Sequence, residues 1–127
     1  MSESIQLALN SSLEAGHAAR VAIAAGYPAL GEPARTDLML LVTELVTNAV
    51  RHGGERGDLP IQLEVERNDG HVHVRVEDPG TTFMPPPAIL SGDSAGGWGL
   101  FLVDQVADRW GVSPALAGTC VWFELAV

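Results

Sequence analysis

Residues 41–54 read Leu-Val-Thr-Glu-Leu-Val-Thr-Asn-Ala-Val-Arg-His-Gly-Gly, and this strongly helical stretch is the most informative feature of the sequence. Its apolar residues, together with Leu38, recur at the offsets that place them on one face of an α-helix. Glu44, Asn48 and His52 recur at every fourth position along the edge of that apolar stripe. We therefore expect a helix that starts near Pro33 and closes at the two glycines, with its stripe in a core and its polar row along a cleft wall.

The flanking sequence predicts further helices and a set of strands. Residues 5–9 alternate like a short edge strand, and Asn10, Ser11 and Ser12 offer N-cap side chains for a helix that reaches about residue 25. Two alternating segments around Asn68-Asp69-Gly70 predict a β-hairpin with one buried face. A helix over residues 98–108 and strands over residues 112–116 and 119–127 follow. Residues 81–96 lack any period, and a loop of this length is either a functional lid or disordered.

Size, charge and cysteine content narrow the class of protein. A chain of 127 residues with 46% hydrophobic content fits a single domain over residues 1–127. The formal charge of −9, with seven scattered Arg and no Lys, argues against nucleic acid or an anionic membrane as the main partner. Cys120 is the one cysteine, and no signal peptide or membrane span is visible, so we expect a cytoplasmic protein without an intrachain disulfide.

Asp78 stands out because of its parity. It follows Val72, Val74 and Val76 at the same spacing, so a strand that extends this far turns the carboxylate towards the buried side. A bare charge is costly there, and we expect a partner to satisfy it. One interpretation is a carboxylate that accepts a hydrogen bond from a ligand amino group such as that of adenine, and the other is a turn-initiating Asp before Pro-Gly.

Each of the other polar positions also has two readings. In one interpretation, Glu44 is a general base and Asn48 is a neutral oxygen ligand for phosphate-bound Mg²⁺. In the other, both residues belong to a solvated helix edge. Gly97 and Gly99 either admit phosphate oxygens to a helix N-terminus or form a simple loop-to-helix turn.

The histidines leave similar choices. His52 either touches the site or caps the helix end. His71 and His73 share a strand face without a third ligand nearby in sequence, which favours solvent exposure over metal binding. No nucleophile elbow and no Cys/His catalytic pair is present.

Order and spacing make the set specific. Glu44-x-x-x-Asn48 on a helix, Asp78-x-Gly80 after a strand, Gly97-x-Gly99 at a helix start and Gly118-Thr119 at the last strand together resemble the GHKL (histidine kinase-like) ATPase family. The segments Glu44-Leu-Val-Thr-Asn-Ala-Val-Arg-His52 and Gly97-Trp-Gly-Leu-Phe-Leu-Val103 are similar to the anti-sigma factor branch, the serine-protein kinases of bacterial partner switching. The resemblance covers about residues 5–127.

The resemblance implies a fold and a set of roles. The fold would be an α/β (α+β) two-layer sandwich of the Bergerat type, with about three helices and a mixed, mostly antiparallel sheet. Glu44 would be the catalytic base, Asn48 the Mg²⁺ ligand and Asp78 the adenine reader. The remaining nucleotide contacts would be the close-approach Gly80, the lid hinge Gly97 and Gly99, and His52, Leu100 and Thr119.

Three functions are compatible with these observations. The first is an ATP- and Mg²⁺-binding anti-sigma factor that phosphorylates a Ser or Thr of a STAS-type antagonist and sequesters a sigma factor. Residues 81–96 contain no Arg or Lys, which favours a second function, a nucleotide-sensing binding module without kinase activity. The third is a pseudo-ATPase that binds a protein without nucleotide. A homodimer is implied by the resemblance alone.

Overall fold

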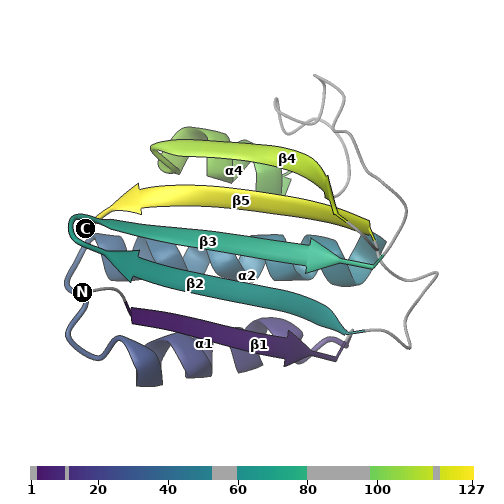
Figure 1. Ribbon diagram of the computed structural model, residues 1–127, viewed down its shortest axis with the longest axis horizontal. Coiled ribbons are helices and arrows are strands. Elements are labelled where there is room, and N and C mark those ends of the chain that lie inside the picture. The colour runs from purple at the N-terminus through teal and green to yellow at the C-terminus, as the bar shows by residue number, and fades with distance from the viewer. Residues whose placement is uncertain (1–2, 11, 53–59, 80–97, 116–117) are drawn as a thin grey trace.

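A five-stranded sheet forms one layer of the protein. The computed structural model describes residues 3–10, 12–52, 60–79, 98–115 and 118–127. The strands lie in the order β1-β2-β3-β5-β4, and every neighbouring pair among them is antiparallel (Figure 1). Their bounds are β1 (Glu3–Leu9), β2 (Ile61–Asn68), β3 (His71–Asp78), β4 (Arg109–Ala115) and β5 (Gly118–Ala126).

Three helices in the described residues form the second layer. They are α1 (Ala15–Gly26), α2 (Ala34–His52) and α4 (Trp98–Val106), and they lie behind the sheet in the view of Figure 1. Helix α2 packs between α1 and α4 and against the central strands β2, β3 and β5. The two-layer α+β class is confirmed. The resemblance implied a mixed, mostly antiparallel sheet, but the described strands contain no parallel pair.

The hairpin β2–β3 sets the register of the sheet. Asn68 pairs with His71, which leaves Asp69 and Gly70 as a two-residue loop, and Gly70 has a φ of 85°. This left-handed conformation at the second loop residue is one that glycine adopts without steric cost. The apolar residues of both strands therefore share one face, and a slip of one residue would turn that face to solvent.

The core lies between this sheet face and the α2 stripe. All the predicted α2 stripe residues are buried except Val50, which is partly buried against the core. Tyr27 adds a polar tie, because its side chain is 1% exposed and its hydroxyl donates to the Val65 carbonyl over 3.2 Å. No helix in the described part of the chain is long and apolar enough to cross a membrane.

Some element boundaries differ from the sequence-based expectations. Helix α1 begins at Ala15, and its N-cap residue Glu14 makes no side-chain capping hydrogen bond. The predicted caps Asn10 and Ser12 were therefore wrong, because the Ser12 carbonyl accepts the Ala15 N–H in a turn that precedes the helix. The third predicted cap, Ser11, lies outside the described residues.

The C-terminal elements are shifted because Asp108 joins the sheet. Its N–H donates to the Glu124 carbonyl over 2.9 Å, and its carboxylate accepts the Ala126 N–H over 2.6 Å. Helix α4 therefore ends at Val106, and β4 starts at Arg109, earlier than the residue 112 expected. Strand β5 stops at Ala126, and Val127 donates its N–H to Gly70 instead of continuing the predicted strand.

Candidate functional site

The polar row of α2 follows the edge of its buried stripe, as the spacing predicts. Glu44 and Asn48 are both half-buried, whereas Leu45 is 2% exposed and Val46 is fully buried. Consecutive helical residues point about 100° apart, so the polar row stands beside the core without entering it. His52 is the last residue of α2, and its side chain lies outside the described part.

Asp78 and Thr119 face each other across the sheet. They are register partners on the adjacent strands β3 and β5, and directly opposed residues bring their Cβ atoms within about 5.5 Å. Strand β3 runs as far as Asp78, so its side chain shares the helix-facing side with Val76, as its parity requires. Thr119 is 1% exposed, and neither side chain is without an interaction partner. The carboxylate therefore lies on the buried side together with a hydroxyl.

These residues gather at one end of the molecule. Figure 1 shows the C-terminal end of α2, the end of β3 and the start of β5 at the same edge. Helix α4 begins at Trp98, so Gly99 and Leu100 belong to its first turn, as predicted. Gly80, Gly97 and the lid residues 81–96 lie outside the described residues, as do Gly53 and Gly54. The described part of the site therefore consists of the α2 row, the Asp78–Thr119 pair and the start of α4.

The donor set fits a purine nucleotide with Mg²⁺. A carboxylate accepts a hydrogen bond from an exocyclic amino group, and a neighbouring hydroxyl can donate or accept. No group of three or more His, Cys, Asp and Glu that could hold a metal occurs among the described residues. Asn48 would then hold Mg²⁺ as a single protein ligand, which suits an ion that keeps phosphate oxygens and waters in its octahedral shell.

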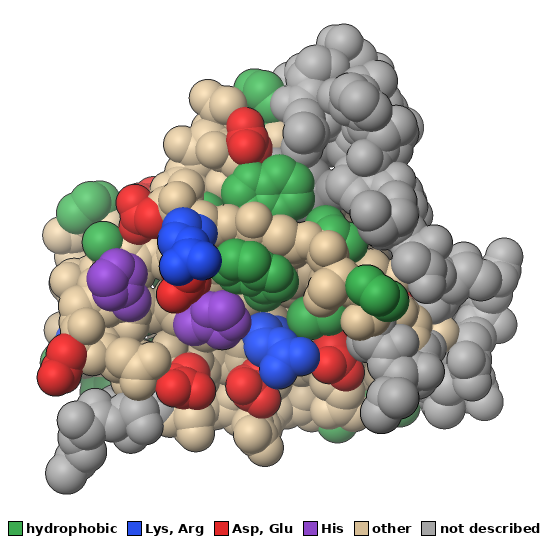
Figure 2. All heavy atoms as spheres, turned by 45° about the horizontal axis from the view of Figure 1, so that its top comes forward, with side chains coloured by type: hydrophobic (Ala, Val, Ile, Leu, Met, Phe, Trp, Pro, Cys, Tyr) green, Lys and Arg blue, Asp and Glu red, His purple; other side chains and the backbone are tan. Residues whose placement is uncertain are grey.

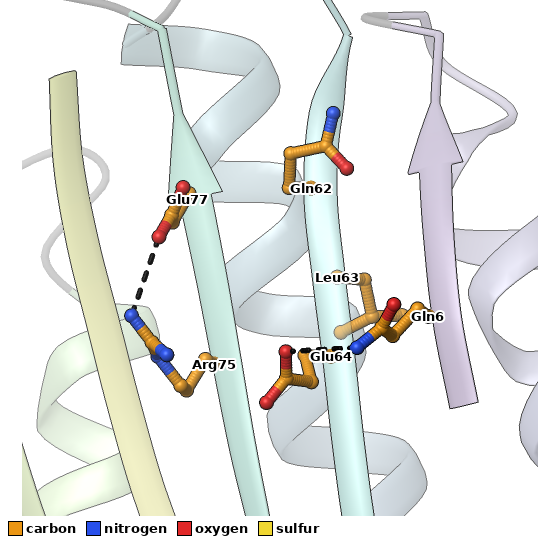
Figure 3. Close-up of a pocket in the computed structure, with 6 residues that line it drawn as sticks. All are labelled: Gln6, Gln62, Leu63, Glu64, Arg75 and Glu77. Atoms are coloured by element: carbon orange, nitrogen blue, oxygen red, sulfur yellow. Dashed lines mark hydrogen bonds and ion pairs between the residues drawn. The ribbon is translucent and has the colours of Figure 1, made fainter. Parts of the chain in front are cut away.

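Two hollows in the described part are lined by other residues. One, of about 230 Å³, opens on the sheet face that no helix covers, and the other, also about 230 Å³, lies between the α1–α2 connection and the end of β5. Figure 3 shows the first hollow between β1, β2 and β3. Its lining side chains are paired with one another, since Gln6 donates to Glu64 over 3.4 Å and Arg75 contacts Glu77 at 3.3 Å. Neither hollow contains a residue of the predicted site.

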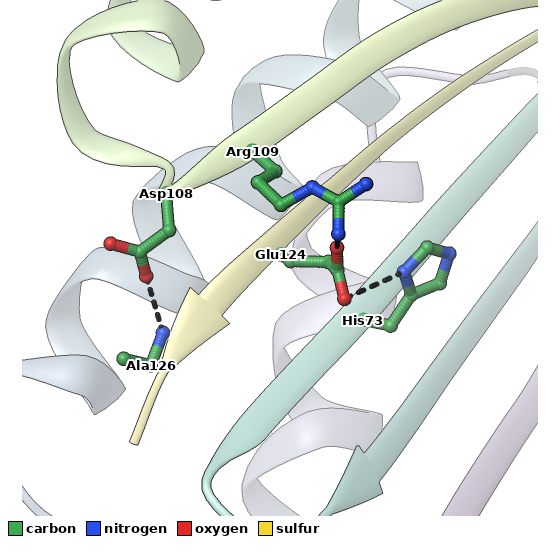
Figure 4. A network of polar contacts seen from close by, with 5 residues as sticks. All are labelled: His73, Asp108, Arg109, Glu124 and Ala126. Atoms are coloured by element: carbon green, nitrogen blue, oxygen red, sulfur yellow. Dashed lines mark hydrogen bonds and ion pairs between the residues drawn. The ribbon is translucent and has the colours of Figure 1, made fainter.

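The uncovered sheet face carries a charged and aromatic cluster that the sequence did not reveal. Acidic, basic and His side chains gather over this face (Figure 2). His73 stacks on Trp122 with ring centroids 5.5 Å apart, and Arg109 lies 6.0 Å from the centroid of the same indole. Glu124 lies between them, 3.8 Å from His73 Nδ1 and 3.5 Å from Arg109 Nη1 (Figure 4). The cluster connects β3, β5 and β4. Within it, His73 contacts Trp122 and Glu124 of the neighbouring strand β5.

Arg75 belongs to the same uncovered face. A hydrogen bond with the Cys120 side chain is the main cause that raises the pKa of Arg75; the nearby carboxylates of Glu64 and Glu77 raise it further, and burial opposes the shift. The guanidinium therefore stays charged at any working pH and is already matched by carboxylates of its own chain.

Sequence reasoning also missed a hydrogen bond between α1 and α2. Arg20 Nη1 donates to Thr43 Oγ1 over 2.9 Å. Helical spacing alone could not show it, because the partner lies on another element. Spacing could not show the facing of Asp78 and Thr119 either, since it depends on strand order, although the resemblance implied that both contact the nucleotide.

The fold and the site together define a class of protein. The sequence matches the family model of the histidine kinase-like ATPase domain over residues 8–125, and the chain belongs to that family. No curated protein sequence matches the chain.

Solved structures share the fold at low sequence identity. One is the crystal structure of the RsbU and RsbW domains of Rv1364c from Mycobacterium tuberculosis, with a TM-score of 0.75 and 18% identity over 96% of this chain. The chain spans about a third of that structure's length, 32%. The other is the SiaB–SiaC complex from Pseudomonas aeruginosa, with a TM-score of 0.63 and 14% identity, covering 97% of this chain and 88% of that one. The likeness to both structures shows that the chain shares their fold.

Proposed function

We propose that the protein is a cytoplasmic, ATP- and Mg²⁺-binding anti-sigma factor, a single histidine kinase-like ATPase domain that acts as a serine/threonine kinase on an antagonist. The observation that carries the proposal is the facing of Asp78 and Thr119 at the edge of the sheet where α2, the helix that carries Glu44 and Asn48, has its C-terminal end. An adenine-reading pair and a phosphate-side row are both needed for one nucleotide, and they come from elements far apart in the sequence.

The residues then take distinct roles. The Asp78 carboxylate accepts from the adenine amino group, supported by the Thr119 hydroxyl. The Asn48 amide oxygen holds the metal, which neutralises phosphate charge when bound. Glu44 accepts the proton of the attacking hydroxyl, and the first turn of α4 offers backbone N–H groups to phosphate oxygens.

The partners follow from family likeness. The similar solved structures are named for RsbU and RsbW domains and for a SiaB–SiaC complex, and the motifs resemble the partner-switching branch. We propose a STAS-type antagonist as the phosphorylated protein and a sigma factor as the sequestered one, with homodimerisation as in the branch that the chain resembles.

A specific feature supports a second function. No Arg or Lys occurs between Gly80 and Gly97, so the chain lacks a cation there to stabilise the transferred phosphoryl group. Such a protein would bind nucleotide as a conformational ligand and regulate its partner without phosphorylating it.

Titration calorimetry with ATP and ADP, with and without Mg²⁺, tests the shared part of both functions. We expect Mg²⁺-dependent ATP binding, loss of that dependence in Asn48→Ala, and loss of adenine selectivity in Asp78→Asn. Glu124→Gln, on the opposite sheet face, is the matched control and should bind as the wild type does. A folded wild-type protein that ignores ATP would overturn both functions and favour the nucleotide-free pseudo-ATPase.

Incubation with ATP and a candidate antagonist separates the two functions. Phosphate on a Ser or Thr of the antagonist, absent with Glu44→Gln, supports the kinase. Mg²⁺-ATP binding that changes antagonist affinity without any phosphate transfer supports the sensing module.

A further inference from the structure

We infer that Arg20 and Thr43 are positioning residues that set the rotation of α2 and thereby the placement of Glu44 and Asn48. The inference rests on the proposed nucleotide site, because it concerns how that site is held in place. Neither residue belongs to the polar row itself.

The contact is a two-step hydrogen-bonded chain between the helices. Arg20 Nη1 on α1 donates to Thr43 Oγ1 over 2.9 Å, and the Thr43 hydroxyl donates to the Met39 carbonyl over 2.7 Å. The hydroxyl uses its one donor and accepts from a charged guanidinium, a stronger hydrogen bond than one between neutral groups. Both Arg20 and Thr43 are half-buried, which limits competition from water.

Gly16 on α1 lies next to α2. A Cβ at that position would lie 3.5 Å from Thr43 Cγ2 and 3.9 Å from Thr47 Oγ1. Thr43 directly precedes Glu44, and Thr47 directly precedes Asn48. Helix α1 therefore lies beside the two α2 residues that directly precede the site residues, and it bonds to the first of them, Thr43.

Because Thr43 and Glu44 are consecutive on one helix, a contact that fixes Thr43 also fixes the direction in which Glu44 points. Thr43 and Glu44 flank the exposed ridge of α2 that carries Leu40 and Thr47, Thr43 on the α1 side and Glu44 on the other. Side-chain ends lie about 5–6 Å from a helix axis, so a rotation of about 10° moves a carboxylate by about 1 Å. A misplacement of about 1 Å at a reacting centre can cost about a hundredfold in rate.

The rest of the α2 surface cannot set this angle as sharply. Its contact with the sheet is made by aliphatic side chains such as Leu41 and Leu45. Apolar packing is non-directional, whereas a hydrogen bond weakens steeply away from its preferred angle. Among the described residues, the Arg20–Thr43 bond thus adds a directional restraint on the rotation of α2 to that of core packing.

Calorimetric titration of Thr43→Val and Thr43→Ser with ATP tests this inference. Valine keeps the shape and removes the hydroxyl, and serine restores the hydroxyl. We expect Thr43→Val to weaken Mg²⁺-ATP binding about tenfold while ATP binding without Mg²⁺, which depends on Asp78, changes less than about twofold. Thr43→Ser should restore the Mg²⁺-dependent increment. Arg20→Met combined with Thr43→Val should be no weaker than the weaker single variant, because both remove the same bond.

The outcomes separate the inference from the proposed function. A wild-type protein without any Mg²⁺-dependent ATP binding overturns the proposed function. Where the wild type does show Mg²⁺-dependent binding, two results for Thr43→Val would overturn the positioning inference. One is that the variant retains the Mg²⁺-dependent increase in affinity, and the other is that it loses affinity equally with and without Mg²⁺. Glu124→Gln serves as the stability control, and its binding should equal that of the wild type.

Discussion

Two glycines respond oppositely to the same added methyl group. At Gly111, on β4, a Cβ would lie 2.8 Å from Trp122 Nε1 and 3.0 Å from two further indole atoms. The indole cannot move away from an added methyl group without losing contacts, because it stacks on His73 and contacts Arg109. Lifting it forfeits a stacking contact of about 0.5–1.5 kcal/mol and a cation–π contact of about 0.5–1 kcal/mol.

At Gly16, on α1, the same methyl group fits. The nearest atoms would lie at 3.5, 3.6 and 3.9 Å, which are ordinary van der Waals distances. Alanine costs less backbone entropy than glycine in a helix, and in a helix interior the gain is roughly 0.5–1 kcal/mol. Gly16 is the second residue of α1, so the gain should fall at the lower end of that range.

We therefore expect Gly16→Ala to raise the free energy of unfolding by about 0.5 kcal/mol and Gly111→Ala to lower it by about 1–2 kcal/mol. Urea denaturation followed by circular dichroism measures both, and equal m-values would show that the two variants are compared on the same transition. Trp122 fluorescence should change in Gly111→Ala alone. Equal shifts of the same sign in both variants would refute the reasoning, because one backbone effect would then outweigh the local geometry.

Three further expectations can be checked by the same denaturation experiment. Leu45→Ala should cost about 2–5 kcal/mol, since it opens a cavity under α2, and a loss below about 1 kcal/mol would contradict the core assignment. Tyr27→Phe should cost about 1 kcal/mol through its bond to the Val65 carbonyl, and an unchanged midpoint would show that water replaces that bond. Glu124→Gln should cost less than about 1 kcal/mol, because its partner Arg109 has a side chain that is 74% exposed, and added salt should reduce the difference further.

The sequence predicted the elements well because their signals are local. The α2 stripe and the alternation in β2 and β3 each depend on residues a few positions apart, so period and turn chemistry were enough. Boundaries set by distant groups were missed. Helix α4 ends early and β4 starts early because Asp108 bonds to Glu124 and Ala126 of β5, which lie far along the chain.

The candidate site was predicted in the same uneven way. The row of Glu44 and Asn48 and the inward parity of Asp78 could be read from spacing, and the structure agrees with both patterns. The pairing of Asp78 with Thr119 could not be derived from spacing, because it requires β5 to lie beside β3 in a register that only the folded sheet supplies. The roles assigned to these residues stay predictions until nucleotide binding is measured.

Helix α2 divides its surface between stability and the proposed chemistry. One side inserts Leu41, Leu45 and Val46 into the core, and the flanking edge presents Glu44 and Asn48. Because the core side also fixes where the edge points, a destabilising core substitution should weaken nucleotide binding only when it lets α2 rotate. An edge substitution such as Asn48→Ala should weaken binding without lowering stability by more than about 1 kcal/mol, as is usual for side chains outside the core. The two effects are therefore separable on a single helix, and their separation distinguishes a nucleotide site from an ordinary solvated helix edge.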